Sequence, residues 1–308
     1  MFALQYSEQG PPEVLTVGEA DEPHAGPGEI RIAVRAVGVT PADWKLRSGG
    51  LPVEARLDWP HIPGFDASGV VDEVGEGVDG VAVGDAVFGV VDTGAFGGAA
   101  AEFAVLVAWA AKPDALSWEE AAGAAGNVET ATRALRLLDI GEGKTLLIEG
   151  AAGGVGTMAI QLAAARGATV IGTARVANHA FLAGLGATPT TYGPGLGERV
   201  AALAPGRVHA VLDAAGSGSL PDLVALAGDP QRVVSVADIG AHEHGVHLTW
   251  MRSGDAPGHE GLAVAARLAA EGRFRVPLHE VFPLADAAKA HELSAAGHVR
   301  GKIVLTVP

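Results

Sequence analysis

The 308-residue chain is long enough for about two domains, because single hydrophobic cores stop growing near roughly 250–300 residues. Its 36 acidic and 21 basic side chains give a net charge of −15, which disfavours nucleic acid or an anionic membrane as a partner. With no cysteine and no pattern of a signal peptide or a membrane span, the sequence predicts a cytoplasmic protein without disulfides.

Short apolar or alternating runs separated by glycine and proline dominate the first third of the chain. They lie at 30–37, 67–74, 85–91 and 101–107. Runs of this length and spacing predict a β-rich, partly barrel-like unit. The pattern changes at Ser117, because Ser117 and Glu120 form a capping box that opens an alanine-rich helix. Residues 130–138 then predict a second helix.

A glycine turn lies between a predicted strand and a predicted helix. The run 145–148 is typical of a buried parallel strand, and the apolar residues from Thr157 on indicate a helix. In the dinucleotide-binding fingerprint Ala151 takes the first glycine position, Gly153 the second and Gly156 the third. The second lets backbone approach a pyrophosphate, and the third lets helix and strand pack closely. We therefore predict dinucleotide contacts, rather than a merely structural turn, at Ala152, Gly153, Gly154, Val155 and Gly156.

Strands and helices alternate after the fingerprint, which implies right-handed crossovers and a doubly wound parallel sheet. The predicted strands are 169–173, 209–213, 232–236 and 246–250, and the predicted helices are 179–185, 196–203 and one that begins near Leu220. In the tail we expect helices at 260–271 and 284–295. A last strand, 303–307, should return to the β-rich unit, since the parallel sheet is already complete.

Four motifs, in this order, resemble the medium-chain dehydrogenase/reductase superfamily, and most closely its zinc-independent quinone oxidoreductases and enone reductases. They are residues 38–49, residues 61–78, the glycine turn with its strand at 148–156, and residues 297–305. The resemblance implies an α/β protein with two domains and the active site in the cleft between them. These are a GroES-like β-rich catalytic domain, 1–120 with 258–308, and a Rossmann doubly wound parallel-sheet domain that binds NADPH, 121–257.

The positions of the metal ligands in zinc-dependent relatives hold other residues here. Thr40 stands near the position of a ligand cysteine, and Phe65 replaces a ligand histidine. Without zinc no Lewis acid ionises an alcohol, so the resemblance implies hydride transfer to a small molecule, a quinone or an α,β-unsaturated carbonyl compound. We interpret the histidine-rich segment 242–247 as a surface loop and predict no metal.

The end of the second Rossmann strand indicates NADPH as the cofactor. No acidic residue follows Thr173 to accept ribose hydroxyls, and Arg175 offers a planar donor fork to a 2′-phosphate. The alternative is a solvated surface arginine. The resemblance places Tyr192 against the adenosine half, unless it is only a partly buried loop residue. The further cofactor contacts that it implies are Thr130, Thr173, Asn178, Ala214, Ala237 and Ile239.

The candidate catalytic residues are Thr40, Asp43 and Trp44. The resemblance places Thr40 near the nicotinamide, where relatives often have asparagine, and its hydroxyl can make one hydrogen bond there. Asp43 is interpreted as a helix cap in preference to a catalytic group. Trp44 with Trp59 forms an aromatic wall for a flat substrate or is simple packing. No residue is predicted as the proton donor, and solvent can serve.

Two other functions stay open at this point. An enoyl-thioester reductase would need a basic patch and a tyrosine donor, and neither Tyr6 nor Tyr192 lies where the resemblance places that donor. A non-catalytic NADPH-binding sensor or structural module would share the fold, because fold does not settle function. By resemblance we also expect a homodimer through the strand 246–250.

Overall fold

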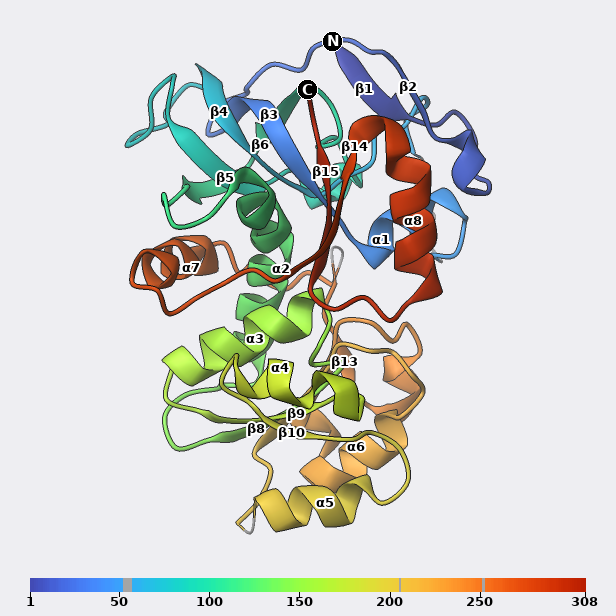
Figure 1. The fold of residues 1–308 in the computed structure, drawn as a ribbon, viewed down its shortest axis with the longest axis vertical. Coiled ribbons are helices and arrows are strands. Elements are labelled where there is room, and N and C mark those ends of the chain that lie inside the picture. Colours follow the sequence, from blue (N-terminus) through green and yellow to red (C-terminus); the bar gives the residue numbers. More distant parts are fainter. Residues whose placement is uncertain (52–56, 205, 251–252) are drawn as a thin grey trace. The chain divides into compact units, whose positions relative to one another are not determined.

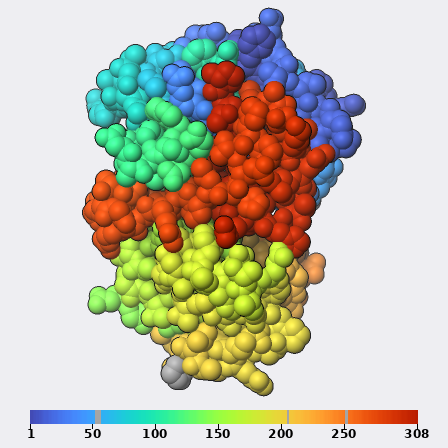
Figure 2. Space-filling view, in the orientation of Figure 1, coloured from blue at the N-terminus to red at the C-terminus, as the bar shows by residue number. Residues whose placement is uncertain are grey.

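The structure is a computed structural model that describes residues 1–51, 57–204, 206–250 and 253–308 (Figure 1). The chain divides into a first unit, Met1–Gly126 with Leu262–Pro308, and a second unit, Asn127–Gly261. Figure 2 shows the C-terminal residues, in red, beside N-terminal residues on the surface of the first unit. No helix in the described ranges is long and apolar enough to cross a bilayer.

The first unit is built on a mainly antiparallel seven-stranded sheet. Its spatial order is β14 (Leu278–Pro283), β15 (Lys302–Thr306), β3 (Ile30–Val39), β4 (Asp66–Val74), β5 (Ala86–Val90) and β7 (Ala108–Ala111), with β6 (Phe103–Leu106) also paired to β3. A separate pair joins β1 (Phe2–Gln5) to β2 (Thr16–Glu19). The strand β15 pairs with β3, which confirms that the last strand returns to the β-rich unit.

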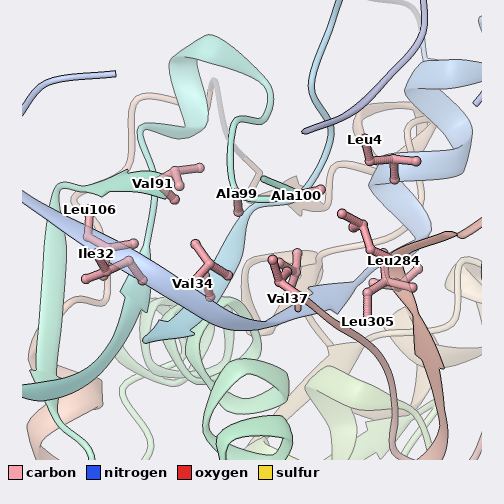
Figure 3. Packing of buried hydrophobic residues seen from close by; sticks show 14 of the residues in the cluster. Leu4, Ile32, Val34, Val37, Val91, Ala99, Ala100, Leu106, Leu284 and Leu305 are labelled. Carbon is pink, nitrogen blue, oxygen red and sulfur yellow. The ribbon is translucent and has the colours of Figure 1, made fainter. Parts of the chain in front are cut away.

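Alternating side chains of β3 supply the centre of this core. Ile30, Ile32 and Val34 are at most 2% exposed, because residues two apart on a strand share one face. Figure 3 shows Ile32 beside Leu106 and places Leu284 beside the last strand, in one cluster of buried apolar residues. The β-rich unit is therefore held together by strands from both ends of the chain.

The helices of the first unit differ from the prediction at 130–138 and at the start of the last helix, which begins at Ala287 and not at Leu284. They are α1 (Pro41–Arg47), α7 (Glu260–Ala270), α8 (Ala287–Ala296) and the first part of α2 (Trp118–Leu137). The capping box is confirmed, since the Ser117 N–H donates to the Glu120 carboxylate at 2.8 Å and the Glu120 N–H to the Ser117 hydroxyl at 3.1 Å. The prediction of a separate second helix at 130–138 is wrong, because α2 continues without a break.

Two glycines lie inside α2, before the predicted start of a second helix at residue 130. A Cβ at Gly123 would lie 3.3 Å from side-chain atoms of Lys302 and Val304, and one at Gly126 would lie 3.0 Å from the Asp66 carboxylate. These glycines bring the helix backbone close to the sheet. The packing outweighs their low helix propensity, which is roughly 1 kcal/mol per glycine.

The second unit is a parallel sheet with helices. Within the described ranges its strand order is β10 (Thr188–Thr190), β9 (Thr169–Thr173), β8 (Thr145–Glu149), β11 (Ala210–Asp213), β12 (Val233–Ser235) and β13 (His247–Leu248). All pairings are parallel. Numbered along the chain this is the order 3-2-1-4-5-6, which confirms the doubly wound Rossmann sheet. Its other helices are α3 (Gly154–Ala165), α4 (His179–Ala183), α5 (Leu196–Leu203) and α6 (Leu220–Ala227).

Other differences from the predicted elements concern short strands and 3₁₀ helices. The strand β10 was not predicted, because it has three residues and contains a proline, and β13 covers only two of the five residues predicted at 246–250. The 3₁₀ helices are η1 (Pro12–Val14), η2 (Thr93–Ala95), η3 (Val176–Asn178), η4 (Pro230–Arg232), η5 (Ala241–His244) and η6 (Leu284–Asp286).

Candidate functional site

The glycine turn joins β8 to α3 in the second unit. Gly150 has a φ of +74°, in the left-handed region that favours glycine, and its carbonyl accepts from the Gly153 N–H at 3.0 Å. The helix α3 begins at Gly154, three residues before the predicted start at Thr157. Sequence periodicity missed its first turn, since two of the three residues there are glycines without an apolar pattern.

Close backbone packing fixes two further small residues of this turn. A Cβ at Gly156 would lie 2.5 Å from the Gly150 carbonyl oxygen and 2.6 Å from the Ala151 Cα, so the third position accepts only glycine. Ala151 occupies the first position because Gly172 on β9 leaves room, and a Cβ there would lie 2.9 Å from that of Ala151. The exchange of glycine for alanine at the first position is thus compensated on the neighbouring strand.

The first turn of α3 suits an anion. The N–H groups of its first residues, Gly154 to Gly156, have no intrahelical acceptors, and a helix N-terminus carries a partial positive charge. A Cβ at Gly153 would contact only the Gly150 carbonyl oxygen, at 3.4 Å, so the space above Gly153 is open to a ligand. Ala152 and Val155 are partly exposed beside it. This cradle fits the diphosphate of a dinucleotide.

The parallel sheet brings most predicted cofactor residues to one edge. Residues that end or follow its strands meet there, because the carboxyl ends of parallel strands share an edge. They are Ala152–Gly156, Thr173, Arg175, Asn178, Tyr192, Ala214, Ala237 and Ile239. Thr130 is not among them, since it lies on α2, where its hydroxyl donates to the Glu129 carboxylate at 3.1 Å.

Arg175 follows β9 as an exposed side chain. Within the described residues no hydrogen bond or ion pair engages its guanidinium, so all of its donors are available to a ligand. Thr173, at the end of β9, is 1% exposed, and its Oγ1 has no partner in the described part of the chain. Asn178 is half-buried at the end of the following 3₁₀ helix. An unengaged arginine at this strand end suits a phosphate group.

Hydrogen bonds hold the loop after β12. The Ser235 hydroxyl donates to the Asp213 carboxylate at 2.8 Å and accepts from the N–H groups of Ala237 at 3.2 Å and Asp238 at 2.9 Å. Asp213 is 1% exposed, so its carboxylate anchors the loop from within. Ile239 is 41% exposed and presents an apolar surface at the sheet edge.

Sequence reasoning missed a second buried carboxylate at this edge. Glu149 ends β8, is 4% exposed, and accepts hydrogen bonds from the hydroxyls of Ser217, at 3.1 Å, and Ser219. Burial raises the pKa of Glu149 above its ordinary value, although the serine hydroxyls oppose the rise. The available signal was an acidic residue at the end of the apolar run 145–148.

One histidine of the segment 242–247 contacts the carboxylate of Asp255. His247 Nε2 lies 2.8 Å from Asp255 Oδ2, which also accepts from the hydroxyls of Thr249 at 2.6 Å and Ser253 at 2.7 Å. Burial acts to raise the pKa of Asp255, but these hydrogen bonds outweigh it and hold the pKa at about 2. Among the residues that the structure describes, no group of three or more histidine, aspartate or glutamate side chains is arranged to hold a metal.

In the first unit, Asp43 is the third residue of α1 and forms a capping box with the N-cap Thr40, and its carboxylate accepts three hydrogen bonds. It accepts from the Thr40 N–H at 2.7 Å and the Thr40 hydroxyl at 2.8 Å, and from the Gly64 N–H at 2.9 Å. Burial raises the pKa of Asp43, and these hydrogen bonds oppose the rise. The geometry agrees with the capping interpretation. It also fixes the Thr40 hydroxyl as a donor to Asp43, so its oxygen is left to accept a hydrogen bond.

The aromatic residues near α1 differ in their exposure to solvent. The Trp44 Nε1 and the Tyr6 hydroxyl are both buried without a partner in the described ranges. The Tyr6 ring meets Trp59 edge-on at 5.7 Å and His61 at 5.2 Å. Trp59 is 49% exposed, whereas Tyr6 is 1% exposed, and burial raises the Tyr6 pKa. Trp59 is thus available to a flat ligand, and Tyr6 serves as its packing support.

Two buried ionisable residues, Asp66 and Lys302, were also not predicted. Asp66 is 0% and Lys302 3% exposed. The Lys302 ammonium donates to the Val39 carbonyl at 3.0 Å, while the Gly126 N–H donates to Asp66 Oδ2 at 2.9 Å. Burial raises the pKa of Asp66, and the Lys302 charge opposes the rise. Both residues belong to motifs quoted from the sequence, yet their proximity depends on the pairing of distant strands.

Two family models match the chain. The first, described as alcohol dehydrogenase GroES-like domain, matches residues 26–113, and the second, described as zinc-binding dehydrogenase, matches residues 188–305. They fall in the β-rich unit and across the second half of the chain, respectively.

Three similar proteins have related descriptions. A chloroplastic quinone-oxidoreductase homolog from Spinacia oleracea is 36% identical over 61% of this chain, and that alignment spans only 59% of the spinach protein. A quinone oxidoreductase from Pseudomonas aeruginosa is 30% identical over 98% of both chains. The solved quinone oxidoreductase from Coxiella burnetii is 32% identical over 100% of this chain and 99% of its own, with a TM-score of 0.86.

Proposed function

Because the chain belongs to the medium-chain dehydrogenase/reductase superfamily, we propose that it is a zinc-independent, NADPH-dependent oxidoreductase that reduces a quinone or an α,β-unsaturated carbonyl compound. The observation that carries the cofactor choice is Arg175, an exposed guanidinium without a partner in the described residues at the end of β9. The names of the similar proteins support the reaction class.

The residues of the second unit fit the parts of a dinucleotide. The first turn of α3 would bind the diphosphate through its N–H groups, over the open space at Gly153. Arg175 would pair with the 2′-phosphate, and the loop of Ala237 and Ile239 would hold the nicotinamide carboxamide. When bound, NADPH supplies the hydride.

The residues at the zinc-ligand positions support chemistry without a metal. Phe65 is 5% exposed and carries no ligand atom, and the Thr40 hydroxyl is already engaged by Asp43. An already electrophilic quinone or activated alkene needs no Lewis acid to accept a hydride, only close positioning. A proton from solvent completes a two-electron reduction of the substrate.

Thr40, Asp43 and Trp44 are proposed to act at the substrate side. Asp43 fixes the rotamer of the Thr40 hydroxyl, whose oxygen then offers lone pairs to a donor such as a hydroxyl group. Trp44 on α1 would present its ring to a flat substrate. A homodimer through β13 is a further proposal, and size-exclusion chromatography with light scattering tests it directly.

The test is cofactor consumption, followed by absorbance, with NADPH or NADH and 1,4-benzoquinone, 9,10-phenanthrenequinone or a 2-alkenal. We expect the wild type to consume NADPH with at least one acceptor. Arg175→Ala should weaken NADPH use by about tenfold or more, since a charge-assisted contact is lost, and should leave NADH use nearly unchanged. Tight NADPH binding without consumption with any acceptor would refute the reductase proposal and favour a binding module.

A further inference from the structure

One arginine organises the turn that follows β10. Arg199 on α5 donates from its guanidinium to the backbone oxygens of Thr191 (3.0 Å), Tyr192 (3.4 Å), Gly193 (3.2 Å) and Pro194 (2.8 Å). Gly195 makes room for this arrangement, since it has a φ of +76° and a Cβ there would lie 2.9 Å from Arg199 Nη1. We call residues 191–194 the carbonyl turn.

The orientation of these carbonyls determines where the amides point. In a trans peptide unit the C=O and the N–H of the next residue point in opposite directions. Because the oxygens of Thr191 and Tyr192 face Arg199, the N–H groups of Tyr192 and Gly193 face away from it. Neither N–H has an acceptor in the described part of the chain. The carbonyl turn also leaves the Tyr192 side chain 51% exposed.

The carbonyl turn lies at the same edge of the sheet as Arg175. The strands β10 and β9 are parallel neighbours in which Thr190 pairs with Thr173. Tyr192 and Arg175 each follow two residues after this pair, so both lie just past the carboxyl ends of adjacent strands. An unengaged guanidinium, two unengaged amides and an exposed aromatic ring therefore follow the carboxyl ends of two adjacent strands.

We propose that Arg199 is a positioning residue for the adenosine ribose of the cofactor, and that it turns the amides of Tyr192 and Gly193 outward to bind the 2′-phosphate together with Arg175. The inference rests on the proposed use of NADPH. Lysine cannot replace this arginine, because four acceptors spread along a turn match a planar fork of donors and not a single ammonium.

The experiment compares two ligands that carry only the adenosine half, adenosine 2′,5′-bisphosphate and 5′-AMP, by isothermal titration calorimetry. The variants are Arg199→Lys and Arg199→Met, with Arg207→Met as a matched control at an exposed arginine of the same unit. We expect both Arg199 variants to bind the bisphosphate about tenfold more weakly and 5′-AMP less than about threefold more weakly. The control should bind both ligands as the wild type does.

The ratio of the two affinities separates the possible outcomes. Equal weakening of both ligands, accompanied by a lower melting temperature, would show that Arg199 only supports the fold and would overturn the inference. Unchanged binding of the bisphosphate in both variants would overturn it as well. A wild type that binds the bisphosphate no better than 5′-AMP would refute the NADPH proposal itself, and the role of Arg199 would fall with it.

Discussion

A buried histidine should make the first unit sensitive to mild acid. His291 on α8 is 1% exposed, and its Nδ1 accepts from the Nε of Arg47 at 3.4 Å. Burial and the neighbouring Arg47 charge lower the pKa of His291 from 6.5 to about 4. The native state therefore keeps this imidazole neutral at pH values at which the unfolded chain already protonates it.

The sign and size of the effect follow from linkage. A lowered native pKa contributes stability above pH 6.5 that is lost as the pH falls toward 4. The full difference corresponds to about 3.4 kcal/mol, and the part expressed between pH 7.5 and 5 is about 2 kcal/mol. Asp43 and Asp66 have raised pKa values and act in the opposite direction, so a single wild-type curve does not isolate the histidine.

The assay is urea unfolding at pH 7.5 and 5, followed by tryptophan fluorescence, for the wild type and His291→Asn. Four of the five tryptophans, Trp44, Trp59, Trp109 and Trp118, lie in the first unit. Asparagine keeps an acceptor for Arg47 but does not titrate. The free energy of unfolding of His291→Asn should therefore fall between pH 7.5 and 5 by about 2 kcal/mol less than that of the wild type. His279→Asn, at an exposed position, is the control. An equal fall in the free energy of unfolding of wild type and His291→Asn between the two pH values would refute the reasoning.

Two further substitutions test the packing of the site. Gly156→Ala should destabilise the second unit by about 1–3 kcal/mol and abolish dinucleotide binding, because the new Cβ meets backbone at 2.5 Å, and a variant that binds NADPH normally would contradict this. Asp43→Asn places an amide donor against N–H groups and should cost about 1–3 kcal/mol by thermal unfolding.

The strands of the parallel sheet were predictable from the sequence wherever the apolar pattern was long. The runs at 145–148 and 169–173 read correctly because buried parallel strands are continuous apolar segments. The strands β10 and β13 were missed or overextended, since two or three residues carry no periodicity. The continuity of α2 was hidden for another reason. Gly123 and Gly126 are unfavourable in a helix unless a neighbour needs the space, and that neighbour lies on β15 or β4.

Residues of the candidate site could be proposed from the sequence where a single local motif contains them. The glycine turn and Arg175 each follow from a few consecutive residues after a strand. Glu149, Lys302 and Arg199 were not found, because their partners lie elsewhere in the sequence or are backbone carbonyls, which leave no signal in residue type. Local chemistry can be recognised from the chain, whereas the residues that hold it in place depend on tertiary contacts.

The pairing of β15 with β3 has a consequence for biosynthesis. Ile303 pairs with Val39 and Leu305 with Val37, so the first unit cannot complete its sheet until residues 302–306 have left the ribosome. All strands of the second unit lie within one continuous stretch, Asn127–Gly261, and are available earlier. Domains generally fold as units during synthesis, and contacts between distant residues form slowly. The second unit should therefore fold before β15 can pair with β3. During that interval the apolar edge of β3 is exposed and can be bound by chaperones.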